Sequence, residues 1–198
     1  MRQAVFIGVV IAALAWPVSP LRAAESVSGH MDAAKAAHAK GDMARAATEL
    51  EAALAELHVR LAKALTEFLP PPLPSWQAET AEAQGLAGAG GGLAVSRAYS
   101  RDDSSVNATL ILDSPAVVGA VALFAANAPA QPNVRRLKIG AEDAILRWDA
   151  ANRAGEVTIV LGGRVLLQIE GDSLGSSDPL VDAAKGWNLT GIRKYLGL

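Results

Sequence analysis

The sequence predicts an α+β fold, in which an N-terminal helical hairpin is followed by an antiparallel sheet with helices packed on it. Two patterns indicate this fold class. Before residue 69, apolar residues recur three and four positions apart, which is the spacing of an amphipathic helix. After residue 76, apolar and polar residues alternate in short segments separated by turn residues, which is typical of antiparallel strands with one solvated face.

The two regions meet at a proline-rich spacer, residues 70–75. The surrounding stretch LPPPLPSW, residues 69–76, contains four of the ten prolines. Consecutive prolines stop a helix and favour an extended backbone, so we expect the hairpin to end at Leu69 and Trp76 to anchor the first strand. The chain then divides into a hairpin at residues 24–69, the spacer, and an α+β domain at residues 76–198.

Composition excludes several classes of protein. Hydrophobic residues make up 51% of the 198 residues and charged residues 19%, so a packed core is expected. The formal net charge of −2 gives no basic excess for a phosphate backbone, and we expect no nucleic-acid partner. The chain has no cysteine, which excludes disulfides, thiol chemistry and cysteine-bound zinc.

Residues 1–23 have the pattern of a secretory signal peptide. A short positive start, Met1-Arg2-Gln3, precedes the apolar run Ala4–Trp16 and the small residues Ala23 and Ala24. A run of 13 residues is too short for a membrane-spanning helix, which needs about 20. We therefore expect cleavage after Ala23, a mature chain without a transmembrane segment, and a location in a bacterial periplasm.

The hairpin contains a break at Lys40-Gly41-Asp42, where glycine ends one helix and Asp42 caps the next. The second helix carries an apolar seam whose members alternate three and four residues apart. They are Ala47, Leu50, Leu54, Leu57, Leu61, Ala64 and Phe68. The first helix offers only small side chains, so it cannot cover the C-terminal half of this seam. We expect another part of the chain, or a partner, to pack there.

Part of the hairpin resembles a single tetratricopeptide repeat over roughly 30 residues. The matching positions are Ala34, Ala37, Gly41-Asp42, Ala46, Leu50 and Ala53. The first helix departs from that family, because Ala33 and Ala37 stand where it has large residues, and no further repeat follows. The resemblance implies an evolutionary repeat of that family, and an amphipathic hairpin docked on its own domain remains the alternative.

Turn and capping signals predict the strands and helices of the region after residue 76. Segments 94–100 and 106–112 are expected to form two strands joined by a polar turn. Ser114-Pro115 is expected to begin a helix that runs to about Asn127. Asp178-Pro179 is expected to begin a final helical segment with a break at residues 186–188. Four more strands are expected at residues 134–139, 143–149, 156–161 and 164–170. With its opening "LPSW" and closing helix, this order of elements resembles the PsbP-like family. That resemblance implies an accessory or assembly role.

No residue set predicts a catalytic, cofactor or metal site. His30, His38 and His58 lack the spacing of metal ligands, and the glycine-rich residues 85–92 lack the lysine and serine or threonine of a triphosphate-binding loop. The strand-rich domain contains no histidine that could serve as base for a serine nucleophile. A polar ladder on one sheet face is expected from Arg147, Thr158, Arg164, Gln168 and Glu170.

The apolar stretch Ala116–Ala126 carries no polar side chain over eleven residues. We expect Val117, Val118, Val121 and Phe124 to pack on the sheet, because they share one arc of the helix. The opposite arc is small and apolar and is expected to meet the hairpin seam, unless a partner protein, a dimer mate or a lipid covers it. The resulting possible interaction face comprises Gly119, Ala122, Leu123, Ala126, Leu57, Leu61 and Phe68.

These patterns favour a non-enzymatic periplasmic accessory or interaction protein, without a cofactor, whose partner is another envelope protein or a second copy. Two alternatives remain: a carrier that holds an apolar ligand between sheet and helices, and an enzyme of unrecognised type.

We expect the mature chain to begin near Ala24 and to be recovered in the soluble periplasmic fraction, because the 13-residue apolar run is too short to remain as an anchor. N-terminal sequencing of fractionated cells measures this. Recovery of the full-length precursor in washed membranes would contradict it.

Overall fold

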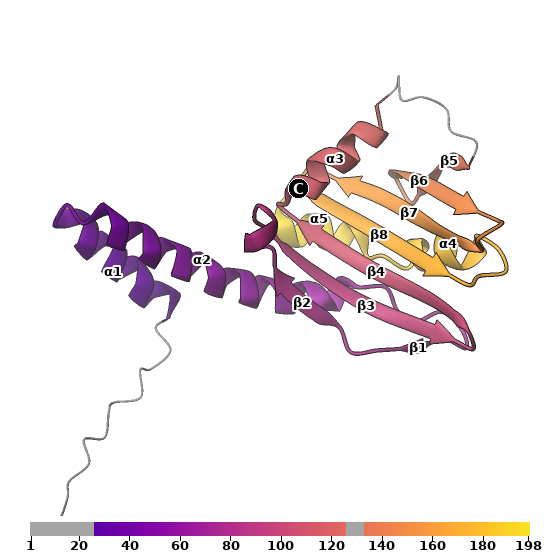
Figure 1. Ribbon diagram of the computed structural model, residues 1–198, viewed down its shortest axis with the longest axis horizontal. Helices are drawn as coiled ribbons and strands as arrows, with labels where there is room; N and C mark the ends of the chain where they lie inside the picture. Colours follow the sequence, from indigo (N-terminus) through magenta and orange to yellow (C-terminus); the bar gives the residue numbers. More distant parts are fainter. Residues whose placement is uncertain (1–25, 126–132) are drawn as a thin grey trace, which may run out of the picture.

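The computed structural model, which describes residues 26–125 and 133–198, confirms the α+β fold (Figure 1). The described strands form one antiparallel sheet of eight strands in the order β1-β3-β4-β8-β7-β6-β5, and β2 also pairs with β3. The strands are β1 (Gln77–Ala78), β2 (Glu82–Gly85), β3 (Leu93–Arg101), β4 (Ser104–Leu112), β5 (Val134–Ile139), β6 (Glu142–Asp149), β7 (Ala154–Leu161) and β8 (Val165–Asp172).

The α-helices of the described chain are α1 (Val27–Ala39), α2 (Met43–Leu65), α3 (Pro115–Leu123), α4 (Asp178–Lys185) and α5 (Leu189–Leu196). Two short 3-10 helices are η1 (Thr66–Phe68) and η2 (Ala87–Ala89). The expected break near residue 187 is confirmed, since Asn188 caps α5 by accepting a hydrogen bond from the Gly191 amide. Within the described ranges, every helix is too short or too polar to cross a membrane.

The N-terminal hairpin has the predicted capping. Gly41 takes a left-handed φ of 76°, and the Asp42 carboxylate accepts a hydrogen bond from the Arg45 amide at 3.1 Å. The side chains that the two helices bury along the hairpin are small: Ala34 and Ala37 from α1, Ala46 and Ala53 from α2. The helices therefore pack through alanine faces, and the leucine seam of α2 does not face α1.

One face of the sheet carries the main hydrophobic core. It is covered by α4, by α5 and by the C-terminal end of α2 with η1 (Figure 1). Leu65, Leu180 and Ile192 from these helices are fully buried. They join inward-facing side chains of the central strands, among them Leu110, Leu146, Ile159 and Leu167.

The proline spacer is part of this core. Leu69 and Trp76 are buried at its two ends, and the Tyr99 hydroxyl of β3 donates a hydrogen bond to the Pro70 carbonyl. The Arg101 guanidinium lies 4.9 Å from the centre of the Trp76 ring, within the range of a cation–π contact. Trp76 thus holds the start of the sheet domain as predicted.

The opposite sheet face carries a smaller core under α3. Val117 and Ala120 are buried there against Leu166, with Ile111 and Val160 beside them. The expectation that Val118 and Val121 also pack on the sheet is wrong, since they are 73% and 44% exposed. A short helix lying on a sheet buries one ridge of side chains, here the pair at i and i+3, and leaves the neighbouring valines in solvent.

The expected packing of α3 on the hairpin seam is also wrong. Leu61 and Phe68 pack against the main core, whereas α3 sits on the other face of the sheet. Side chains alternate across a strand, so Leu110 and Ile111 of β4 belong to different cores. Gly119 and Ala122 are exposed and Leu123 is partly buried, while Ala126 lies outside the described residues.

Replacing Val117 with Asp should destabilise the fold by about 3 kcal/mol or more, because it buries an unpaired carboxylate and removes packing against Leu166. The matched change Val118→Asp should shift the free energy of unfolding by only about 0.5 kcal/mol, because Val118 is exposed. Thermal melts of the two variants measure the difference. Equal melting temperatures would show that this face of α3 is misassigned.

Candidate functional site

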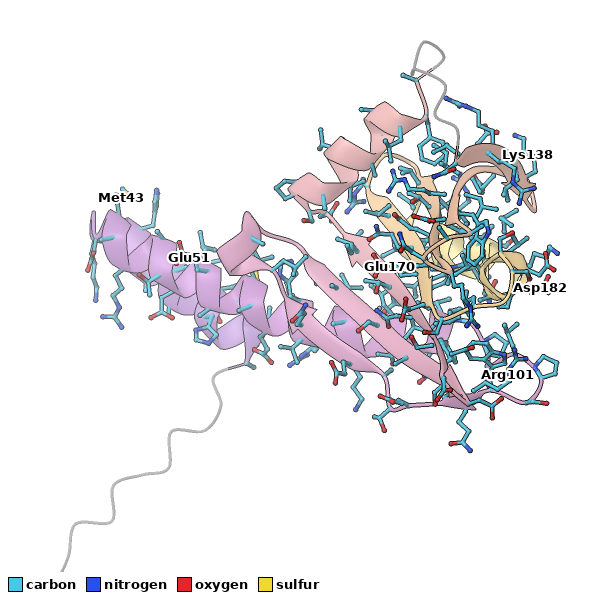
Figure 2. The ribbon with its side chains drawn as sticks, turned by 45° about the vertical axis from the view of Figure 1, so that its right-hand side comes forward. Met43, Glu51, Arg101, Lys138, Glu170 and Asp182 are labelled. Carbon is cyan, nitrogen blue, oxygen red and sulfur yellow. The ribbon has the colours of Figure 1, made fainter. Side chains whose placement is uncertain are left out.

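A row of apolar side chains lies exposed along α2, and we call it the α2 stripe: Met43, Ala47, Leu50, Leu54 and Leu57. Leu50, Leu54 and Leu57 remain 54%, 51% and 48% exposed. The hairpin extends beyond the sheet as an arm (Figure 1), and Figure 2 shows Met43 near its free end with Glu51 farther along α2. The same seam continues through Leu61 and Phe68, which are partly buried on the main core. The arm therefore presents the uncovered half of a continuous helical seam.

A groove of about 630 Å³ runs beside this stripe, between α2 and the β2–β3 connection, and we call it the α2 groove. One wall comes from α2 and is mainly apolar, whereas the other comes from β2 and the glycine-rich loop. The lining residues are Glu51, Leu54, Ala55, His58, Val59 and Ala62 on one side and Ala83, Gln84, Gly85, Gly91 and Gly92 on the other. Leu54 belongs both to the stripe and to the groove.

The glycine-rich segment forms the second wall for a local reason. Gly90, Gly91 and Gly92 all have positive φ, and a Cβ on Gly92 would lie 2.3 Å from the Leu112 carbonyl oxygen. The loop closes through hydrogen bonds of 2.9 Å between Leu86 and both Gly91 and Gly92. The result is a wall with few side chains, which lets another backbone approach closely.

An ion pair stands near the groove, at the end of β4. The Arg164 guanidinium donates two hydrogen bonds to the Asp113 carboxylate, at 2.9 and 2.7 Å. This places Arg164 in the turn before β8, so it is not part of the polar ladder expected on the sheet face. The hydrogen bonds from Arg164 lower the pKa of Asp113, against the effect of partial burial, and the charges of Arg164 and His58 lower it further.

The rest of the expected ladder occupies the sheet face beside α3. Glu156 is its centre: one carboxylate oxygen accepts hydrogen bonds from Thr158 at 2.8 Å and Gln168 at 3.0 Å, and the other pairs with Arg147 at 3.2 Å. These contacts join β6, β7 and β8. Glu170 lies directly opposite Glu156 and is exposed (Figure 2). A shallow trough of about 570 Å³ lies over this polar face.

The side chains considered for catalysis or metal binding are dispersed. His30 contacts Glu49 at 2.9 Å between the hairpin helices, His38 is exposed near the tip, and His58 lines the α2 groove. The described residues contain no group of three His, Asp or Glu side chains placed to hold a metal ion. Ser104 bonds to the Ser173 carbonyl and Ser114 caps α3.

The groove could not be anticipated from the sequence, because β2 is short and polar and carries no strand signal. Only the stripe had a signal, the spacing of its leucines. Comparison with protein-family models, with curated proteins and with solved structures found no match. The role of the stripe and groove is therefore inferred from their own geometry.

The Asp113–Arg164 pair predicts a pH-dependent contribution to stability. Because the folded pKa of Asp113 lies below its ordinary value of 3.8, the contribution is present above that pH and is lost as the pH falls through the folded value. Both side chains are well exposed, so it should amount to about 1 kcal/mol or less. The melting temperatures of wild type and Asp113→Asn should differ at pH 7 and converge as the pH falls through the folded pKa of Asp113.

Asp102→Asn is the matched control, because Asp102 has the same left-handed φ of 53° and no ion pair within the described ranges. Its melting temperature should follow wild type at every pH. A difference for Asp113→Asn that persists in acid would rule out the ion pair as its source.

Proposed function

We propose that this chain is a non-enzymatic interaction protein of the bacterial periplasm, which binds a helical protein partner along the α2 stripe and the α2 groove. The sheet domain serves as the base that holds the hairpin in place. The export signal expected at residues 1–23 supports the location, and the resemblance of the domain to PsbP-like proteins favours an accessory role.

The observation that carries the proposal is the exposure of Leu50, Leu54 and Leu57 on a projecting helix. A soluble protein rarely leaves a contiguous apolar row in water unless it is a binding surface. Apolar side chains at spacings of three and four are how helices recognise one another. The adjoining groove, with its glycine-rich wall, adds room for a second helix to lie against α2.

A binding role is further favoured over catalysis by how the polar side chains are used. Glu156 is held by three neighbours on the sheet, and His30 contacts Glu49 within the hairpin. These contacts hold each group in the fold, although Glu156 and Arg147 also line the shallow trough over this sheet face.

A second candidate function is transport of an apolar ligand, and the α2 groove is the observation that favours it. Its volume lies within the range of about 300 to 1,000 Å³ that small-molecule sites occupy. The ligand would lie in this groove, since the gap beside Trp76 and Tyr99 in the main core has a volume of only about 10 Å³. Mass spectrometry of native and delipidated protein tests this role, and an empty native protein would argue against it.

The partner-binding proposal is tested by Leu54→Glu. Leu54 is half exposed, so the melting temperature should change by only a few degrees, while binding should be lost because a carboxylate would enter an apolar contact. Crosslinking and affinity capture from periplasmic extract should recover partners with wild type but not with this variant.

Val118→Glu is the control, because Val118 is an exposed apolar residue on α3, away from the stripe. It should capture the same proteins as wild type. If Leu54→Glu also captures them, the stripe is not the binding surface; if its melt collapses, the stripe belongs to the folded core.

A further inference from the structure

One wall of the α2 groove is the edge strand β2, whose main chain is open on the groove side. We propose that an extended segment of the partner adds a strand to this edge, antiparallel to β2, while the helical part of the partner lies on the α2 stripe. This inference rests on the proposed function of the stripe and groove, and it names the conformation and the charge of the segment that enters the groove.

The free edge of β2 carries unused hydrogen-bonding groups. A 2.9 Å hydrogen bond from the Leu86 N–H to the Gly92 carbonyl shows which residues of this ladder bond to β3. Hydrogen-bonded pairs alternate along an antiparallel ladder, so the N–H and C=O groups of Ala83 and Gly85 point away from β3. Within the described chain, β2 pairs with no strand other than β3, and these four groups have no hydrogen-bond partner.

The space beside this edge is open on the side of the sheet where α2 lies (Figure 1). Ala83 and Gly85 pair with main-core residues of β3, so they face that side. A Cβ added to Gly85 would meet no atom within 4 Å, and every residue of β2 is exposed. Leu54 and Val59 of the facing wall are 51% and 70% exposed. Because Leu54 also belongs to the stripe, a partner that covers the stripe reaches the groove.

These groups select an extended main chain. Directly opposite residues of an antiparallel pair exchange two hydrogen bonds, so an added strand satisfies all four groups of Ala83 and Gly85. A helix uses its backbone groups internally and a lipid chain has none, so neither satisfies this edge. Antiparallel pairing is also slightly more stable than parallel pairing, and strand addition to an exposed edge is an established mode of peptide recognition.

The neighbouring side chains specify the pattern of the segment. Residues opposite Ala83 and Gly85 would turn toward the apolar wall of α2, and we expect them to be apolar. The residues between them would turn to the other face, where Glu82 lies. Glu82, and Glu51 in the groove, have no ion-pair partner among the described residues, and the described lining contains no lysine or arginine. Opposite charges across a ladder attract, so apolar residues alternating with basic ones fit best.

A capped peptide of about seven residues, in which valine alternates with lysine and threonine, tests the proposal on the purified chain. Amide hydrogen exchange measured by NMR is the readout. With the peptide at about ten times its dissociation constant, exchange at Ala83 and Gly85 should slow by about tenfold. Gln84 already bonds to β3 and is the internal control, whose exchange should change little. No protection of Ala83 and Gly85 at about 1 mM peptide would overturn the inference.

Two N-methylated forms of the peptide are a matched pair. In the antiparallel arrangement the valine N–H groups point toward β2, and those of lysine and threonine point away. Methylation of the valine nitrogens should abolish protection, whereas methylation of the others should change the dissociation constant by no more than about threefold. Equal binding of both forms would show an occupant that does not pair with the edge. Glutamate in place of lysine should weaken binding by about threefold or more at low salt, and equal affinity would overturn the charge assignment.

Ala83→Pro removes one outward N–H, and edge strands tolerate proline where that group faces solvent. Its melt should change by only a few degrees, while the peptide should bind about tenfold more weakly. Ala83→Ser keeps the N–H and is the control. Gly85→Val is a second blocking variant, because its side chain would fill the open space beside α2 without a clash. A folded Ala83→Pro or Gly85→Val chain that binds the peptide like wild type would overturn the inference.

The peptide and the extract capture separate this inference from the proposed function. If the peptide fails to protect the edge but capture still depends on Leu54, strand addition is wrong and the binding role of the stripe stands. If the peptide protects Ala83 and Gly85 but Leu54→Glu captures the same proteins as wild type, the groove binds an extended segment and the stripe is not the partner surface.

Discussion

The architecture depends on the docking of the C-terminal end of α2 in the main core. Leu65 is fully buried there, Leu69 follows it, and the Tyr99 hydroxyl holds the Pro70 carbonyl next in the chain. This short stretch determines the direction of a helix of 23 residues, which is about 35 Å long. Because the sheet can cover only the last turns, the rest of α2 extends beyond it. The α2 stripe lies on that extended part.

The stripe is exposed because α1 packs on only one of the two apolar faces of α2. The helix offers α1 an alanine face and a leucine face, and α1 brings only small side chains to the contact. Two alanine surfaces let the helix axes approach closely, and the distance between packed helices depends on the side chains at the contact. The hairpin is therefore held together by Ala34, Ala37, Ala46 and Ala53, and the leucines stay free for another helix.

The two faces of the sheet carry different kinds of side chain. Its main-core face is mainly apolar and supports α2, α4 and α5, while its other face carries α3 at one end and the Glu156 network at the other. That network joins three strands through one carboxylate, so its polar side chains serve the sheet. The candidate site lies instead at the edge of the sheet, where β2 and the glycine-rich loop meet the arm.

The sequence by itself determined the hairpin and its caps, the proline connector, the order of most strands and the leucine spacing of α2, because these depend on neighbouring residues. It did not reveal β2, the groove, or the two valines of α3 that face solvent. The exposure of the two valines depends on which sheet face each helix covers, and β2 and the groove depend on contacts between separate segments of the chain. Either face of β4 offers apolar side chains, Leu110 on one and Ile111 on the other, so local periodicity cannot assign a helix to a face. Only the tertiary structure decided that α3 and the seam of α2 lie on opposite sides, because burial there is set by contacts between segments far apart in the chain.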